Sequence, residues 1–168
     1  MFSKFPPEIR DALSFHLEDQ EVWDLGCGLD LRQSNVLRRL GAKKVFAVDK
    51  DLKDLRAAMP GVVEHRSYFQ DLPKGASPRL VFMGWPSCYN NDIEVLASRA
   101  ETVIFLGQVN RSTMCGGSNL WRHLLTRELE CYQYHPRNSL MVYSKGLDQL
   151  RKCRCPEEAV AASAYNIY

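Results

Sequence analysis

Glu21-Val22-Trp23-Asp24-Leu25-Gly26-Cys27-Gly28 is the stretch of sequence that decides the fold. Its first five residues form a short, mainly apolar run, which stops at two glycines separated by one residue. Asp30-Leu31-Arg32-Gln33 follows and has the order of a capping box, which predicts the start of a helix that ends at Gly41. A buried strand, a glycine turn and a helix in this order are typical of an α/β sheet.

Strands and helices alternate along most of the remaining chain. This alternation predicts a Rossmann-like, doubly wound and mostly parallel sheet of about seven strands, with helices on both faces. Only Pro136-Arg137-Asn138 separates the last two strands, so we expect them to form a C-terminal antiparallel hairpin. Further helices are expected near residues 6–17, 51–59, 93–99 and 119–129, and strands at 21–25, 44–49, 62–69, 80–83, 102–106, 130–135 and 139–143.

The length of 168 residues fits a single domain, residues 1–168. We expect an N-terminal helix in residues 1–20, a core over 20–145 and a tail over 146–168. No run approaches the roughly 18 apolar residues that span a bilayer, and no signal-peptide pattern follows the first residues. We therefore expect a cytoplasmic protein with reduced cysteines, whose spacing does not suit a metal site. The net charge of +2 does not call for a polyanionic partner, although basic residues cluster at 38–44 and 151–154.

The glycine turn is placed to hold a nucleotide cofactor. In an open α/β sheet, ligands lie outside the carboxyl ends of the strands. Gly26 and Gly28 let the backbone approach a ligand without interference from a Cβ atom. Asp49 ends the next strand about 20 residues later, where a carboxylate can accept hydrogen bonds from ribose hydroxyls. A dinucleotide fingerprint would have a further glycine at position 31, so Leu31 argues against a dinucleotide.

The turn from Asp24 to Gly28 resembles the first motif of class I S-adenosylmethionine-dependent methyltransferases, an acid-x-Gly-x-Gly sequence. The resemblance covers residues 20–145 and includes the expected hairpin, but Asp30 stands where these enzymes usually have a third glycine. It implies S-adenosylmethionine as the cofactor. It further implies a methionine end held by Asp24, Gly26, Cys27 and Gly28, a ribose held by Asp49, an adenine lined by Tyr68, Phe69 or Asp71, and further cofactor contacts from Gly84 and Trp85.

The loop after the fourth strand, Gly84-Trp85-Pro86-Ser87-Cys88, would face the methyl group. It lacks the Asp/Asn-Pro-Pro-aromatic sequence of many amino-methylating members. It also resembles the Gly-Gly-Pro-Pro-Cys loop of cytosine-5 methyltransferases, in which the cysteine attacks a flipped base, and this makes Cys88 a candidate nucleophile. Against that assignment, the glutamate expected after the fifth strand is absent, and the chain has no room for a target-recognition domain.

The Trp-Pro loop, together with Leu106-Gly107-Gln108 and Cys115-Gly116-Gly117, resembles a little-characterised group of small, single-domain methyltransferase-like proteins. This resemblance implies that Trp85, Gln108 and residues 110–117 frame the substrate entrance. The catalytic candidates are therefore Trp85, Cys88 and Gln108. Our interpretation is an enzyme that methylates a small molecule or a biopolymer, without a membrane partner. Two alternatives stay open: a non-catalytic S-adenosylmethionine-binding protein, and a nucleic-acid methyltransferase of the cytosine-5 type.

Overall fold

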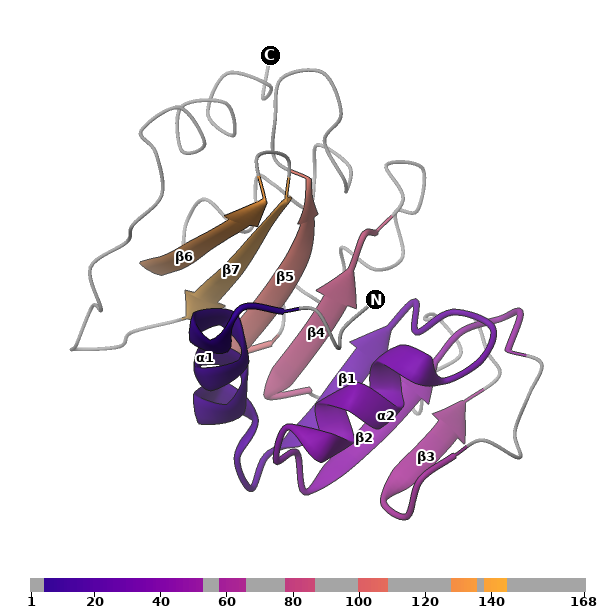
Figure 1. The fold of residues 1–168 in the computed structure, drawn as a ribbon. Coiled ribbons are helices and arrows are strands. Elements are labelled where there is room, and N and C mark those ends of the chain that lie inside the picture. Colours follow the sequence, from indigo (N-terminus) through magenta and orange to yellow (C-terminus); the bar gives the residue numbers. More distant parts are fainter. Residues whose placement is uncertain are drawn as a thin grey trace.

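The computed structural model describes residues 5–52, 58–65, 78–86, 100–108, 128–135 and 138–144 (Figure 1). Five parallel strands lie in the order β3-β2-β1-β4-β5. On the outer side of β5, β7 pairs antiparallel with β5, and β6 pairs antiparallel with β7. The predicted α/β fold with a parallel sheet is confirmed. The strands are β1 (Glu21–Leu25), β2 (Lys44–Val48), β3 (Val62–His65), β4 (Leu80–Gly84), β5 (Thr102–Gln108), β6 (Glu128–His135) and β7 (Asn138–Ser144).

The strand order reverses between β1 and β4. The chain moves outward from β1 to β2 and β3, and β4 then pairs with the other side of β1. Because these strands are parallel, their carboxyl ends lie at the same edge of the sheet, toward which the arrowheads of β1, β2, β4 and β5 point in Figure 1. A reversal of this kind leaves a crevice at that edge, where open α/β sheets bind ligands.

Both described helices, α1 (Pro7–Leu17) and α2 (Arg32–Arg39), lie on the same face of the sheet (Figure 1). The predicted N-terminal helix is thus present as α1, and its residues Ile9, Leu13 and Leu17 recur every four positions and are all buried. They share one core with Leu37 of α2 and with strand residues such as Phe82. Each large apolar side chain buried in this way contributes roughly 1.5–3 kcal/mol.

The opposite face of the central strands is buried as well. Successive strand residues point to opposite faces, and Leu25, Val48, Val81 and Phe105 have at most 1% of their surface exposed. Strands buried on both faces are typical of parallel sheets. This explains why β1, β2, β4 and β5 are mainly apolar in the sequence. No helix in the described ranges is long and apolar enough to span a membrane.

The start of α2 differs from the predicted capping box. The N-cap is Leu31, in the left-handed conformation (φ 57°, ψ 9°), and no side chain caps the helix. Asp30 instead accepts a hydrogen bond from the Arg32 backbone N–H (3.2 Å) and pairs with its guanidinium (2.8 Å). Gln33 does not return to Asp30, because its carboxamide is bound to the buried Asp24. Complete burial of the Leu31 side chain offsets the roughly 1–2 kcal/mol that its backbone conformation costs.

Several element boundaries also differ from those expected. β5 continues to Gln108, since Gly107 and Gln108 are in register with Ser139 and Asn138 of β7, and the loop expected from Gly107 begins later. β6 begins at Glu128, where a helix was expected to continue to residue 129. In the segment 51–59, residues 51, 52, 58 and 59 are not helical, so the helix expected there was too long. Residues 53–57, the expected helix 93–99 and the tail 146–168 lie outside the described residues.

Candidate functional site

The turn after β1 is tied to the end of β2 by backbone hydrogen bonds. The N–H groups of Gly26 and Cys27 both donate to the carbonyl oxygen of Val48, at 2.9 and 3.3 Å. The Gly28 N–H donates to Oδ2 of Asp49 at 3.0 Å, and the Asp51 N–H donates to Oδ1 at 2.9 Å. The glycine turn is therefore in direct contact with Asp49, the acid expected to bind the same ligand, at the carboxyl edge of the sheet.

Open space lies beside Gly28. Its φ of 85° is in the left-handed region, which favours glycine. A Cβ atom added at this position would meet no atom of the described residues within 4 Å. Packing therefore does not require glycine here, and the backbone is accessible to a group that approaches from outside the turn.

Asp49 keeps capacity for a ligand. An ionised carboxylate offers about four acceptor positions. Among the described residues, the backbone N–H groups of Gly28 and Asp51 use one position on each oxygen, and Asp49 is only partly buried. The remaining positions could therefore accept hydrogen bonds from two vicinal hydroxyl groups, while the backbone contacts fix the orientation of the carboxylate.

Asp24 is completely buried beneath this turn. Gln33 Nε2 donates to its Oδ1 at 2.5 Å, and the Ser34 hydroxyl donates to its Oδ2 at 2.6 Å. Burial raises the pKa of Asp24 to about 7, and the nearby Asp49 charge adds to this, while the two hydrogen bonds act in the opposite direction. The visible role of Asp24 is to fasten the first turn of α2 to β1, and its expected contact with the methionine end stays a prediction.

Gln33 and Ser34 are site residues that the sequence analysis missed. Both are buried, at 8% and 0% exposure, in the first turn of α2. The available signal was a polar pair that follows a strand carrying an acid between apolar residues, since such an acid needs buried donors. The capping-box interpretation assigned Gln33 to the helix start and so concealed this pairing.

Cys27 contributes its backbone N–H to the turn, and its side chain packs in the core. Its side chain is 5% exposed, packs with Leu31, Ala47 and Leu52, and its Sγ lies 3.5 Å from the Gly28 carbonyl oxygen. Burial raises the pKa of the Cys27 thiol, and the charges of Asp24 and Asp49 raise it further. The thiol therefore stays protonated and unreactive, so any cofactor contact of Cys27 falls to its main chain.

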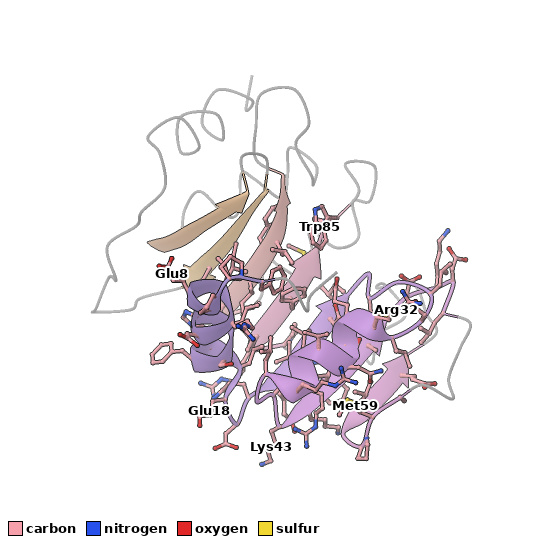
Figure 2. All side chains as sticks on the ribbon, viewed as in Figure 1. Glu8, Glu18, Arg32, Lys43, Met59 and Trp85 are labelled. Carbon is pink, nitrogen blue, oxygen red and sulfur yellow. The ribbon has the colours of Figure 1, made fainter. Side chains whose placement is uncertain are left out.

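The end of β4 forms the other side of the site. A Cβ atom on Gly84 would lie 2.3 Å from Gln33 Oε1, so the carboxamide occupies the space that a side chain would need. Trp85 follows with φ 47°, and its N–H donates to the Leu106 carbonyl oxygen at 2.6 Å. Figure 2 shows Trp85 at the carboxyl end of β4 and Arg32 at the start of α2, whereas Glu18 and Lys43 lie near the opposite edge of the sheet.

The structure thus gathers part of the expected site at one edge. Asp24, residues 26–28, Asp49, Gly84 and Trp85 lie at or next to the ends of three adjacent strands, β2, β1 and β4. Gln108 is the last residue of β5 and is in register with Asn138. The remaining candidates, Tyr68, Phe69, Asp71 and Cys88, lie outside the described residues.

Comparisons with known proteins bear on the fold. No protein-family model and no curated protein sequence matches this chain. Magnesium protoporphyrin IX methyltransferase from Synechocystis PCC 6803, solved with bound S-adenosylmethionine, is similar with a TM-score of 0.56 and 16% identity over 83% of this chain and 77% of that one. Precorrin-6y C5,15-methyltransferase from Geobacter metallireducens GS-15 is similar with a TM-score of 0.54 and 17% identity, over 85% of this chain and 92% of that one. A 23S rRNA methyltransferase is similar with a TM-score of 0.55 and 14% identity, over 95% of this chain and 74% of that one.

These similarities establish the architecture. The chain has the fold of class I S-adenosylmethionine-dependent methyltransferases. The glycine turn after β1 and the acid after β2 lie at the strand-order reversal of that fold.

Proposed function

We propose that this chain is an S-adenosylmethionine-dependent methyltransferase whose cofactor lies at the carboxyl ends of β1, β2 and β4. The observation that carries the proposal is the contact of the Gly28 N–H with Asp49 at 3.0 Å, beside a backbone position where an added Cβ atom would have no described atom within 4 Å. A glycine turn bonded to an acid that retains acceptor capacity suits a nucleoside with an attached chain. The methyltransferase fold selects S-adenosylmethionine among such ligands.

Each part of the cofactor has proposed partners. The methionine end would lie along residues 26–28, above the buried Asp24, and the ribose hydroxyls would donate to Asp49. Tyr68, Phe69 or Asp71 would line the adenine. Gly84 and Trp85 would face the sulfonium centre, which supplies an electrophilic methyl group when the cofactor is bound. The chain would then need only to hold an electron-rich acceptor atom in line with that methyl group, and Trp85, Cys88 and Gln108 are the candidates for this task.

We further infer that β6 and β7 complete a seven-stranded sheet of the methyltransferase type and that residues 1–168 form one domain. The antiparallel pairing of β7 with β5 supports this, because seven residue pairs extend from Thr102 to Gln108. A dinucleotide-binding enzyme would need another βαβ half at this place.

The contacts of Asp30 are compatible with cofactor binding. A carboxylate in place of the usual third glycine would repel a carboxylate ligand if it were uncompensated. Here its oxygens are engaged by the backbone N–H and guanidinium of Arg32, at 3.2 and 2.8 Å. The Asp30 charge is thus paired within the loop, which removes one objection to cofactor binding and leaves the choice between an enzyme and a non-catalytic binding protein to the transfer assay.

Binding calorimetry tests the cofactor assignment. The wild-type protein should bind S-adenosylmethionine and should not bind NAD. Asp49→Asn keeps an oxygen that can accept from the Gly28 N–H but removes the negative charge. The affinity for S-adenosylmethionine should fall at least about tenfold, because hydrogen bonds to a charged group contribute roughly 1.5–3 kcal/mol. Asp51→Asn is the matched control, because it removes a neighbouring exposed carboxylate and keeps the backbone N–H that holds Asp49. Absence of S-adenosylmethionine binding, or equal loss in both variants, would contradict the assignment.

Methyl transfer itself needs a separate assay. The protein would be incubated with S-adenosylmethionine labelled in the methyl group and with pools of small metabolites and of RNA. We expect label in one pool, and an Asp49→Asn protein should transfer less. Binding without any transfer would favour the non-catalytic alternative.

A further inference from the structure

We propose that Gln33 is a positioning residue that fixes the end of β4 against the turn after β1 and thereby sets the gap for the methyl-bearing end of the cofactor. The last part rests on the proposed function. The first part concerns only the fold and can be tested by itself. Gln33 acts through Asp24 on one side and through Gly84 on the other.

The carboxamide of Gln33 lies over two adjacent strands. Asp24 of β1 is in register with Phe82 of β4, so Gly84 lies two residues further along on the same face. Gln33 Nε2 donates to Asp24 Oδ1 at 2.5 Å. The other end of the same group occupies the Cβ position of Gly84, where Oε1, Cδ and Nε2 would be 2.3, 2.9 and 3.1 Å from an added atom.

Gln33 and Ser34 have different reach. Both donate to the carboxylate of Asp24 and both are buried. The Ser34 hydroxyl is on a short side chain, and its described bond is to Asp24. The three described atoms nearest to the Gly84 Cβ position all belong to the Gln33 side chain. Gln33 therefore joins β1 to β4 at the site, whereas Ser34 holds α2 to β1.

Trp85 follows Gly84 directly in the chain and has constraints of its own. Trp85 has a left-handed backbone conformation, its N–H donates to Leu106 at 2.6 Å, and its ring packs against the main core. A shift of Gly84 away from α2 would change the direction in which the chain leaves β4. The fit of Gln33 against the glycine thus determines how close Trp85 approaches the turn of residues 26–28.

The affinities for S-adenosylmethionine and S-adenosylhomocysteine test the positioning role. The two ligands differ only in the methyl group and its charge, so a general loss of stability would weaken both equally. We expect Gln33→Ala to change the ratio of the two affinities by about fivefold or more, which corresponds to the loss of one modest contact. Ser34→Ala removes the other hydrogen-bond donor to Asp24 and should lower the affinities for both ligands by the same factor. An unchanged ratio in Gln33→Ala would overturn the role at the methyl end.

A double-mutant cycle tests the contact without any ligand. Gly84→Ala places a Cβ atom on the Gln33 carboxamide and should lower the unfolding midpoint. In the Gln33→Ala background that space is empty, so the same substitution should cost clearly less. Additive effects of the two substitutions would overturn the contact. If the wild-type protein binds neither ligand, the proposed function fails, and this cycle still decides whether Gln33 spans β1 and β4.

Discussion

At the scale of single residues, the buried Asp24 carboxyl group keeps its proton to a higher pH in the folded protein than in the unfolded chain. Burial raises its pKa to about 7 from a usual value of 3.8. Between these two values the folded protein binds one more proton than the unfolded chain, so the free energy of unfolding falls as pH rises through this window, by at most about 1.4 kcal/mol per pH unit. The contribution is fully present below the lower value and is lost above pH 7.

Asp24→Asn should remove this dependence. The amide is uncharged at every pH, its oxygen can accept from Gln33, and its NH₂ group can donate to the Ser34 hydroxyl. We expect the variant to become more stable relative to wild type as pH rises from 4.5 to 7.5, measured by urea unfolding at each pH. A difference between the two proteins that stays constant with pH would show that Asp24 titrates normally in the folded state.

Sequence patterns could locate Gly26, Gly28 and Asp49, because a positive φ and a strand-end acid leave a local signature. They could not place Gln33. A glutamine three residues after an aspartate fits a capping box, and the choice of a buried carboxylate instead depends on a strand nine residues away in sequence. The left-handed backbone conformation of Leu31 could not be predicted either, because only burial of its side chain in the folded protein offsets the strain.

At the scale of elements, Arg38 ties α2 to the two strands beneath it. Its Nε donates to the carbonyl oxygen of Pro60 at 3.0 Å, just before β3, and another guanidinium nitrogen donates to Ala42 at 2.6 Å, just before β2. The guanidinium also occupies the space beside Gly61. α2 is thereby held at its C-terminal end by Arg38 and at its N-terminal end by Gln33 and Ser34.

Arg38→Ala should destabilise the protein by about 1–3 kcal/mol, because two carbonyl groups lose a charged donor. Arg39→Ala is the matched control. It removes the same charge from the last turn of α2 and has the same relation to the helix dipole, but this residue is exposed. It should change stability by less than about 0.5 kcal/mol. Equal losses in chemical denaturation would mean that the charge, and not the two contacts, is what Arg38 supplies.

The strands were the most predictable elements, since a buried parallel strand is a continuous apolar run between breaks. Their ends were less predictable. Gly107 and Gln108 suggest a loop, yet they continue β5 because β7 pairs with them. Pairing between distant segments decides such ends, and a local pattern does not contain it.

At the scale of the whole molecule, stability should be highest along the centre of the sheet. β1 and β4 are paired on both sides and are mostly buried, whereas β3 lies at the edge and Val63 is 37% exposed. We therefore expect the slowest amide hydrogen exchange in β1, β4 and β5, and faster exchange in β3. Protection of β3 equal to that of β1 would indicate that the edge is covered in solution.

We propose that the edge formed by the ends of β1, β2 and β4 holds S-adenosylmethionine. The most direct test is a crystal structure of the protein with S-adenosylhomocysteine. We expect both ribose hydroxyls within hydrogen-bond distance of the Asp49 carboxylate, the amino-acid end along residues 26–28, and the sulfur facing Gly84 and Trp85. A ligand bound elsewhere, or an Asp49 carboxylate without ligand contact, would contradict it.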